Sequence, residues 1–173
     1  MELKKKMAVF MTASVLLVSC GENKKTSETT ETAIESGNPV NTGAEQRDGK
    51  AEIVLSSDDR MRFDLSTIEV FEGQTVQLTL KHTGTMSKQS MGHNFVLLAQ
   101  GVDVNAFGQK AASASSTEYI PQDETGDIIA YTRLIGGGES DTIEFPALAK
   151  GIYDFICSFP GHYGIMKGKF VVK

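Results

Sequence analysis

Apolar and polar residues alternate with a period of two along much of this 173-residue chain. In residues 61–70 the apolar positions are Met61, Phe63 and Leu65, and the alternation then changes register over 68–70. Turns that contain glycine, aspartate or proline separate the segments. Many short segments of this kind predict an all-β sandwich or barrel. The others are residues 51–57, 75–82, 93–99, 127–135, 141–148, 151–159 and 168–173.

One internal stretch departs from this pattern. Residues 101–122, GVDVNAFGQKAASASSTEYIPQ, are rich in alanine and serine and show no period of two. We expect this stretch to leave the sheets and to contain a short helix.

The first residues of the chain have the pattern of an export signal. Three lysines, at positions 4–6, precede the short apolar run MAVFMTASVLLVS, which is too short for an ordinary membrane span. The sequence Leu17-Val18-Ser19-Cys20 resembles the lipobox of bacterial lipoproteins. This resemblance implies a signal peptide over residues 1–19, lipidation of Cys20, and a place in the cell envelope, either periplasmic or at the cell surface. A plain signal peptide with a chance cysteine is the alternative.

The composition changes after Cys20. Residues 21–49 have no aromatic residue and are dominated by Glu, Thr, Ser, Asn and Gly, so they cannot bury enough apolar surface to fold. We expect residues 20–49 to be a lipidated tether that spans roughly 30 Å on average, and residues 50–173 to form one domain. The net charge of −5 gives no indication of nucleic-acid binding.

The candidate chemistry lies near the end of the chain. In CSFPGHYGIMKGKF, Cys157, His162 and Met166 fall within ten residues, on a loop that Pro160 and Gly161 turn back between two predicted strands. A lone residue of any of these types is most often a packing residue, but the spacing Cys-x4-His-x3-Met is uncommon. The segment SMGHNF offers His93 as a second imidazole.

Two histidines, one cysteine and a distant methionine are the ligand set of a blue-copper electron-transfer centre. A thiolate favours Cu(I), imidazole suits both oxidation states, and a weak thioether withholds the donation that Cu(II) prefers. Four protein ligands leave no open position for a substrate, so an enzyme is not expected.

Three other functions use some of these residues. A thiol enzyme would use Cys157 as nucleophile and His162 as base, but leaves His93 and Met166 unexplained. A copper storage or delivery protein would use the same soft ligands, but would need an exchangeable site. Zinc could also load such a site adventitiously.

The sequence resembles the azurins, which are cupredoxins. The segments that carry the resemblance are GHN at 92–94, CSFPGH with IMKG in the final loop, and DRMRFDLSTIEV, LKHTG, MGHNFVL and IAYTRLIGGGESDTIEF in the same order. The resemblance implies a cupredoxin-like Greek-key β-sandwich of about eight strands with one type 1 copper.

It assigns the copper ligands to His93, Cys157 and His162, with Met166 as a weak axial ligand. It also implies that the Gly92 carbonyl is a second weak axial contact, that Asn94 and Ser158 join the two ligand loops, and that the Phe159 N–H donates to the thiolate.

The resemblance further implies a docking surface around His162. Partners would be redox proteins such as c-type cytochromes or copper or haem reductases, and the protein would be a monomer. The residues of this surface are Met61, Met86, Met91, Gly161 and Ile165, with Phe159 beside them.

Some features differ from the azurin pattern. The usual disulfide is not expected, because lipidation of Cys20 would leave Cys157 as the only free thiol. Phe95 stands where many azurins have tryptophan. His82 lies outside the ligand set, and we interpret it as a buried, hydrogen-bonded histidine. Coupling of its protonation to the redox state is the alternative.

Overall fold

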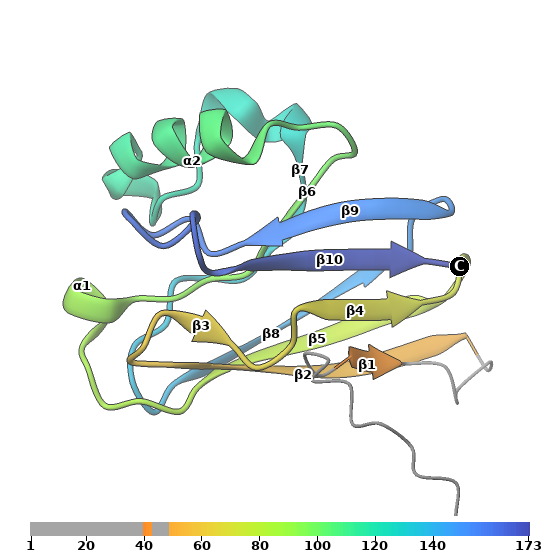
Figure 1. Ribbon diagram of the computed structural model, residues 1–173, viewed down its shortest axis with the longest axis horizontal. Helices are drawn as coiled ribbons and strands as arrows, with labels where there is room; N and C mark the ends of the chain where they lie inside the picture. Colours follow the sequence, from red (N-terminus) through yellow and green to blue (C-terminus); the bar gives the residue numbers. More distant parts are fainter. Residues whose placement is uncertain (1–39, 43–48) are drawn as a thin grey trace, which may run out of the picture. The chain divides into compact units, whose positions relative to one another are not determined.

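Two β-sheets pack face to face in a computed structural model that describes residues 40–42 and 49–173 (Figure 1). This confirms the predicted β-sandwich. Among the described residues, one sheet has six strands and the other has four. In spatial order the first sheet is β1 (Val40–Thr42), β4 (Thr67–Val70), β10 (Lys167–Val172), β9 (Gly151–Ile156), β6 (Val96–Leu98) and β7 (Ile128–Tyr131). The second is β3 (Arg62–Phe63), β2 (Lys50–Asp58), β5 (Thr75–His82) and β8 (Ser140–Pro146).

The register change in residues 61–70 marks a strand that changes sheets. β3 pairs with β2 in the four-stranded sheet, whereas β4 pairs in parallel with β10 in the six-stranded sheet. A register shift of one residue turns every side chain to the opposite face. By crossing between the sheets, the chain keeps both Phe63 and Ile68 directed at one core.

The core lies between the two sheets. Alternate residues of β2 and β5 are buried while their neighbours are more exposed, as the period of two predicts. Each large apolar side chain that is fully buried contributes about 1.5–3 kcal/mol. The largest of them in this core are Phe95, Phe155, Phe170, Ile53, Leu55, Ile68, Leu78, Leu80, Leu97 and Ile135.

A second apolar layer covers the outer face of the six-stranded sheet. The predicted helix is present as α2 (Val104–Ser113), whose first turn is capped by the Asp103 carboxylate. Phe107 and Ala111 of α2 pack against Val96, Leu98 and Ile156 of the sheet. Short 3-10 turns, η2 (Ser115–Thr117) and η3 (Gln122–Asp127), lead from α2 back to β7.

The strand β1 lies within the stretch that was expected to be a tether. Val40, Asn41 and Thr42 pair in parallel with Thr67, Ile68 and Glu69 of β4. Apart from Gly49, the remainder of the tether, the signal peptide and Cys20 lie outside the described residues. Within the described ranges, no helix combines the length and the apolar character needed to cross a membrane.

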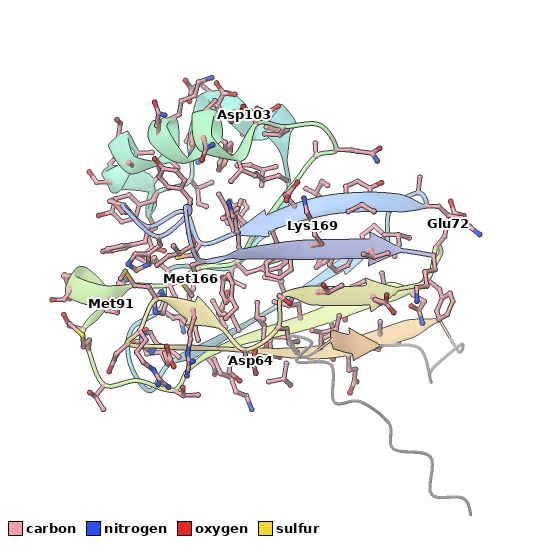
Figure 2. All side chains as sticks on the ribbon, viewed as in Figure 1. Asp64, Glu72, Met91, Asp103, Met166 and Lys169 are labelled. Carbon is pink, nitrogen blue, oxygen red and sulfur yellow. The ribbon has the colours of Figure 1, made fainter. Side chains whose placement is uncertain are left out.

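One end of the sandwich gathers the candidate site. The β9–β10 loop and α1 (Lys88–Met91) lie at this end, opposite the C-terminus (Figure 1). Figure 2 shows Met91 and Met166 at this end and Glu72 at the other.

Candidate metal centre

Three side chains from two loops meet at this end of the sandwich. His93 lies between α1 and β6, Cys157 directly follows β9, and His162 lies in the β9–β10 loop. Their ligand atoms all lie within 4.8 Å of one another. The Cys157 Sγ is 3.8 Å from Nδ1 of His93 and 3.5 Å from Nδ1 of His162. The structure therefore brings these three predicted residues together.

The spacing of these atoms fits a bound metal ion. A metal bonded to sulfur at about 2.3 Å and to nitrogen at about 2.0 Å in a trigonal plane separates the two ligand atoms by about 3.7 Å. The two measured sulfur–nitrogen distances, 3.8 and 3.5 Å, lie on either side of that value. Thiolate and imidazole are also the donors that copper prefers.

Backbone hydrogen bonds fix the shape of the ligand loop. Pro160 and Gly161 form a type II turn, closed by a bond of 3.0 Å from the His162 N–H to the Phe159 carbonyl, with Gly161 at φ +82°. The Met166 N–H donates to the His162 carbonyl, and the Cys157 N–H donates to the Met166 carbonyl.

These bonds hold Met166 beside Cys157. Its side chain is fully buried in one cluster with Cys157, Leu134 and Phe159.

Gly92 lies close to the thiol. Its carbonyl oxygen is 3.9 Å from the Cys157 Sγ. A Cβ atom at position 92 would lie 2.5 Å from the Lys88 carbonyl oxygen, so any other residue would force the end of α1 apart. Glycine thus permits the tight approach of this carbonyl to the site.

Asn94 and Ser158 join the two ligand segments. The Ser158 N–H donates to Oδ1 of Asn94, and Nδ2 of Asn94 donates to the Ser158 hydroxyl, each at 2.9 Å. Both residues are fully buried. This is the pairing that the resemblance implied.

Burial sets the protonation of the three candidate ligands. Burial lowers the pKa of His93 to about 4 and that of His162 to about 4, so both imidazoles are neutral at pH 7. Burial raises the pKa of Cys157 to about 12, although the N–H groups of Asn94 and Phe159 act in the opposite direction. The thiol therefore keeps its proton until a cation replaces it, which suits a metal ligand better than a nucleophile.

Several groups that hold the ligands have no recognisable signal in the sequence. The Asp58 carbonyl lies 3.0 Å from Nε2 of His93. It accepts the proton of that nitrogen and leaves Nδ1 free to face the thiol. The Glu118 and Tyr119 carbonyls accept bonds from Asn94 and Ser158.

His82 is buried and fully hydrogen-bonded. Its Nδ1 accepts the Gly84 N–H, and its Nε2 donates to the Met91 carbonyl, both at 3.0 Å. Its ring stacks on His93 with centroids 4.4 Å apart. This is the structural role that we preferred from the sequence.

The expected docking residues differ in exposure. The Ile165 side chain is 64% exposed and Met86 is 40% exposed, Gly161 is exposed, and Met61 and Met91 are half-buried. Phe159 is buried, and its ring packs on His162 with centroids 4.7 Å apart. His162 itself is 3% exposed, whereas His93 and Cys157 are fully covered.

Comparison with known proteins identifies the family of this chain. The family "Copper binding proteins, plastocyanin/azurin family" matches residues 50–173. The chain belongs to the plastocyanin/azurin family. Like other cupredoxins, it is a copper-binding electron-transfer protein, and its cofactor is type 1 copper.

Individual cupredoxins and relatives support this. The chain is 40% identical over 124 residues to "Outer membrane protein H.8" of Neisseria gonorrhoeae, covering 70% of this chain and 67% of that protein. It is 37% identical over 128 residues to azurin of Pseudomonas fluorescens biotype C, covering 72% and 99%. Dithionite-reduced auracyanin of Roseiflexus castenholzii superposes with a TM-score of 0.63 at 38% identity, covering 70% of this chain and 96% of that chain.

Proposed function

We propose that this protein is a one-electron carrier of the cell envelope, with copper held by His93, Cys157 and His162. The observation that carries the proposal is the buried triangle of one thiol and two imidazole Nδ1 atoms, all within 4.8 Å. Met166 would be a weaker ligand, and the Gly92 carbonyl would be a second weak contact. When bound, copper supplies the Cu(I)/Cu(II) couple.

The protein's part is to keep the ligands in one arrangement in both redox states. The Asp58 carbonyl holds the His93 ring, and the Asn94–Ser158 pair holds the two ligand segments at a constant distance. The N–H groups of Asn94 and Phe159 stabilise negative charge on the Cys157 sulfur. Because little has to move when the charge changes, electron transfer is fast.

Burial of the ligands favours a carrier over a storage or delivery protein. Storage and delivery require copper to exchange, but the three ligand side chains are at most 3% exposed and are braced from two sheets. Electrons enter at His162, the ligand nearest the surface. The docking surface around it comprises Met61, Met86, Met91, Gly161 and Ile165. This surface is small and apolar, as is typical of the interfaces that redox proteins form briefly.

Visible and EPR spectra of the copper-loaded protein test this proposal. We expect an intense thiolate-to-copper band near the red end of the spectrum and a narrow copper hyperfine splitting. Cys157→Ser should remove the band and leave a folded protein, as judged by circular dichroism. A strong blue band in that variant would exclude Cys157 as the ligand. Rapid loss of copper from the wild type to a chelator would favour the delivery function.

The site of action is proposed from the N-terminal sequence and one relative. Cleavage before Cys20 and lipidation of its thiol would anchor the domain to the membrane through residues 20–49. The anchored protein would be a monomer. Its redox partners would be c-type cytochromes or copper or haem reductases. The name of the gonococcal relative, "Outer membrane protein H.8", supports an envelope location. Cys20→Ala should release the protein from the membrane fraction and abolish incorporation of labelled fatty acid. A Cys20→Ala variant that stays in the membrane fraction without the label would contradict the lipid anchor.

A further inference from the structure

The hairpin between β2 and β3 carries an unusual turn residue next to the metal centre. Asp58 pairs with Arg62 across the hairpin, and the three-residue loop between them ends at Met61, whose φ is +55°. Three-residue hairpin loops place a left-handed residue at this position, and glycine or asparagine is favoured there. Met61 is a strained choice, which indicates that its side chain serves a purpose other than turn formation.

The hairpin is fixed to the ligand cluster. The Asp58 carbonyl oxygen accepts from Nε2 of His93, at 3.0 Å, and the rings of His93 and His162 have centroids 5.1 Å apart. The base of the hairpin is therefore one hydrogen bond away from a candidate ligand.

Two arginines flank Met61 and share a single carboxylate. The Nε atoms of Arg60 and Arg62 lie 3.1 and 2.9 Å from Oδ2 of Asp58. Their side chains remain 72% and 58% exposed. Each guanidinium has five N–H donors, so the single Asp58 carboxylate cannot occupy most of them. It also neutralises only one of the two positive charges, and the other remains available to another molecule.

The other carboxylates near the hairpin are occupied by the protein itself. Asp59 accepts the N–H groups of Thr85 and Met86. Asp64 accepts the Ser56 N–H, and Glu118 is paired with Lys88. These carboxylates thus each have a partner within the protein, although Asp64 is exposed and the Glu118 side chain is 44% exposed.

A groove adjoins Arg62. It has a volume of about 510 Å³, and its lining includes Arg62, Ile165 and Lys167 as well as the carboxylates of Asp58 and Asp64. Ile165 belongs to both the groove and the proposed docking surface, so charged side chains of both signs border it in the groove.

We propose that Arg60, Met61 and Arg62 select the redox partner, and that they fit a protein whose apolar redox edge is bordered by carboxylates. This inference rests on the proposed electron-carrier function. Met61 contacts the apolar edge, and the two guanidinium forks pair with carboxylates, for which their planar geometry is suited. Opposite charges orient the encounter and raise its rate more than they raise affinity.

Two forms of one cytochrome test the charge requirement. Native mammalian cytochrome c is basic, and succinylation of its lysines makes it acidic without changing the haem edge. Stopped-flow measurement at low ionic strength follows transfer of one electron from ferrous haem to the copper(II) site; no bond forms or breaks and no proton moves. The quantity compared is the ratio of the rate with succinylated cytochrome to the rate with native cytochrome, for each variant.

Matched double variants separate position from net charge. Arg60→Gln/Arg62→Gln and Lys50→Gln/Lys150→Gln each remove two positive charges, but Lys50 begins β2 and Lys150 precedes β9, at the opposite end of the sandwich. We expect the arginine variant to lower the ratio roughly threefold to tenfold, and the lysine variant to change it much less. Equal shifts in both variants, or none in the arginine variant, would overturn the proposal.

Met61→Gly tests the strained residue. Glycine suits the left-handed turn, so thermal stability should be unchanged or higher, while transfer from both cytochromes should slow severalfold. Normal rates in the glycine variant would show that Met61 does not contact the partner. Lower stability than the wild type would show that Met61 serves packing instead. A wild-type protein without the blue band would overturn the electron-carrier function, whereas a blue protein without charge preference would overturn this inference alone.

Discussion

Asn94 and Ser158 are separated by 64 residues in the chain, yet two hydrogen bonds of 2.9 Å join them beside the ligand thiol. Asn94 directly follows the proposed ligand His93, and Ser158 directly follows the proposed ligand Cys157. The distance between the two ligand segments is therefore set by an amide and a hydroxyl rather than by the metal alone.

Replacing Asn94 by alanine should weaken both the fold and the site. The Ser158 N–H would be left buried without its acceptor, and such a loss costs about 1–3 kcal/mol. We expect a lower melting temperature for the apoprotein and a shifted or broadened thiolate-to-copper band. Ser158→Ala is the milder comparison, because it keeps the backbone bond to Asn94. Equal stability of wild type and Asn94→Ala would mean that the pair does not brace the site.

The two ligand imidazoles should make the stability of the apoprotein depend on pH. Their pKa values are about 4 in the folded protein and 6.5 in the unfolded chain. Between these values the unfolded chain binds more protons, so the free energy of unfolding rises with pH and levels off above about 6.5. Acidification from pH 7 to pH 5 should thus destabilise the apoprotein, before most carboxyl groups titrate.

Urea unfolding of the apoprotein at several pH values between 5 and 7 measures this dependence. His162→Gln removes one of the two imidazoles and should reduce the slope by about half, whereas the Lys150→Gln variant should keep it. A free energy of unfolding that is constant over this range would show that the ligand imidazoles are not held neutral by burial.

The ligand loop was predictable because its chemistry is local in sequence. Cys157, His162 and Met166 fall within ten residues, and the Pro160–Gly161 turn has a clear signature. Backbone groups that support the ligands have no such signature. The Asp58 and Tyr119 carbonyls could belong to any residue type, and the left-handed conformations of Met61, Glu118 and Tyr119 occur at residues that rarely adopt them.

The sheets were predictable for a similar reason, and the strand that changes sheets was not. The period of two shows which side chains face the core, but both sheets face the same core. The sequence therefore showed the register change in residues 61–70 without showing that β3 and β4 belong to different sheets.

A shortened protein that begins at Lys50 should fold and bind copper normally. The core cluster is built from residues 51–172, and β1 adds only three residues at the edge of the six-stranded sheet. A version that begins at Ser36 and keeps β1 is the matched control. Melting temperatures and the blue band of the two proteins should agree closely. Failure of only the shorter protein to fold would assign β1 a structural role.

Substitution of Met166 should tune the reduction potential without destroying the site. Its side chain is fully buried beside Cys157, and a thioether is a weak, long axial donor. Leucine has a similar volume and no donor, so Met166→Leu should change the free energy of unfolding by less than about 1.5 kcal/mol. Loss of axial donation hurts Cu(II) more than Cu(I), and the potential should rise.

Met166→Gln should shift the potential in the opposite direction, because an amide oxygen is a harder donor that favours Cu(II). The three remaining ligands, His93, Cys157 and His162, should keep all three proteins blue. Cyclic voltammetry of the copper-loaded proteins should therefore give the order leucine above methionine above glutamine. If the three potentials coincide, Met166 does not act on the metal, and its buried side chain serves only to pack the cluster of Leu134, Cys157 and Phe159.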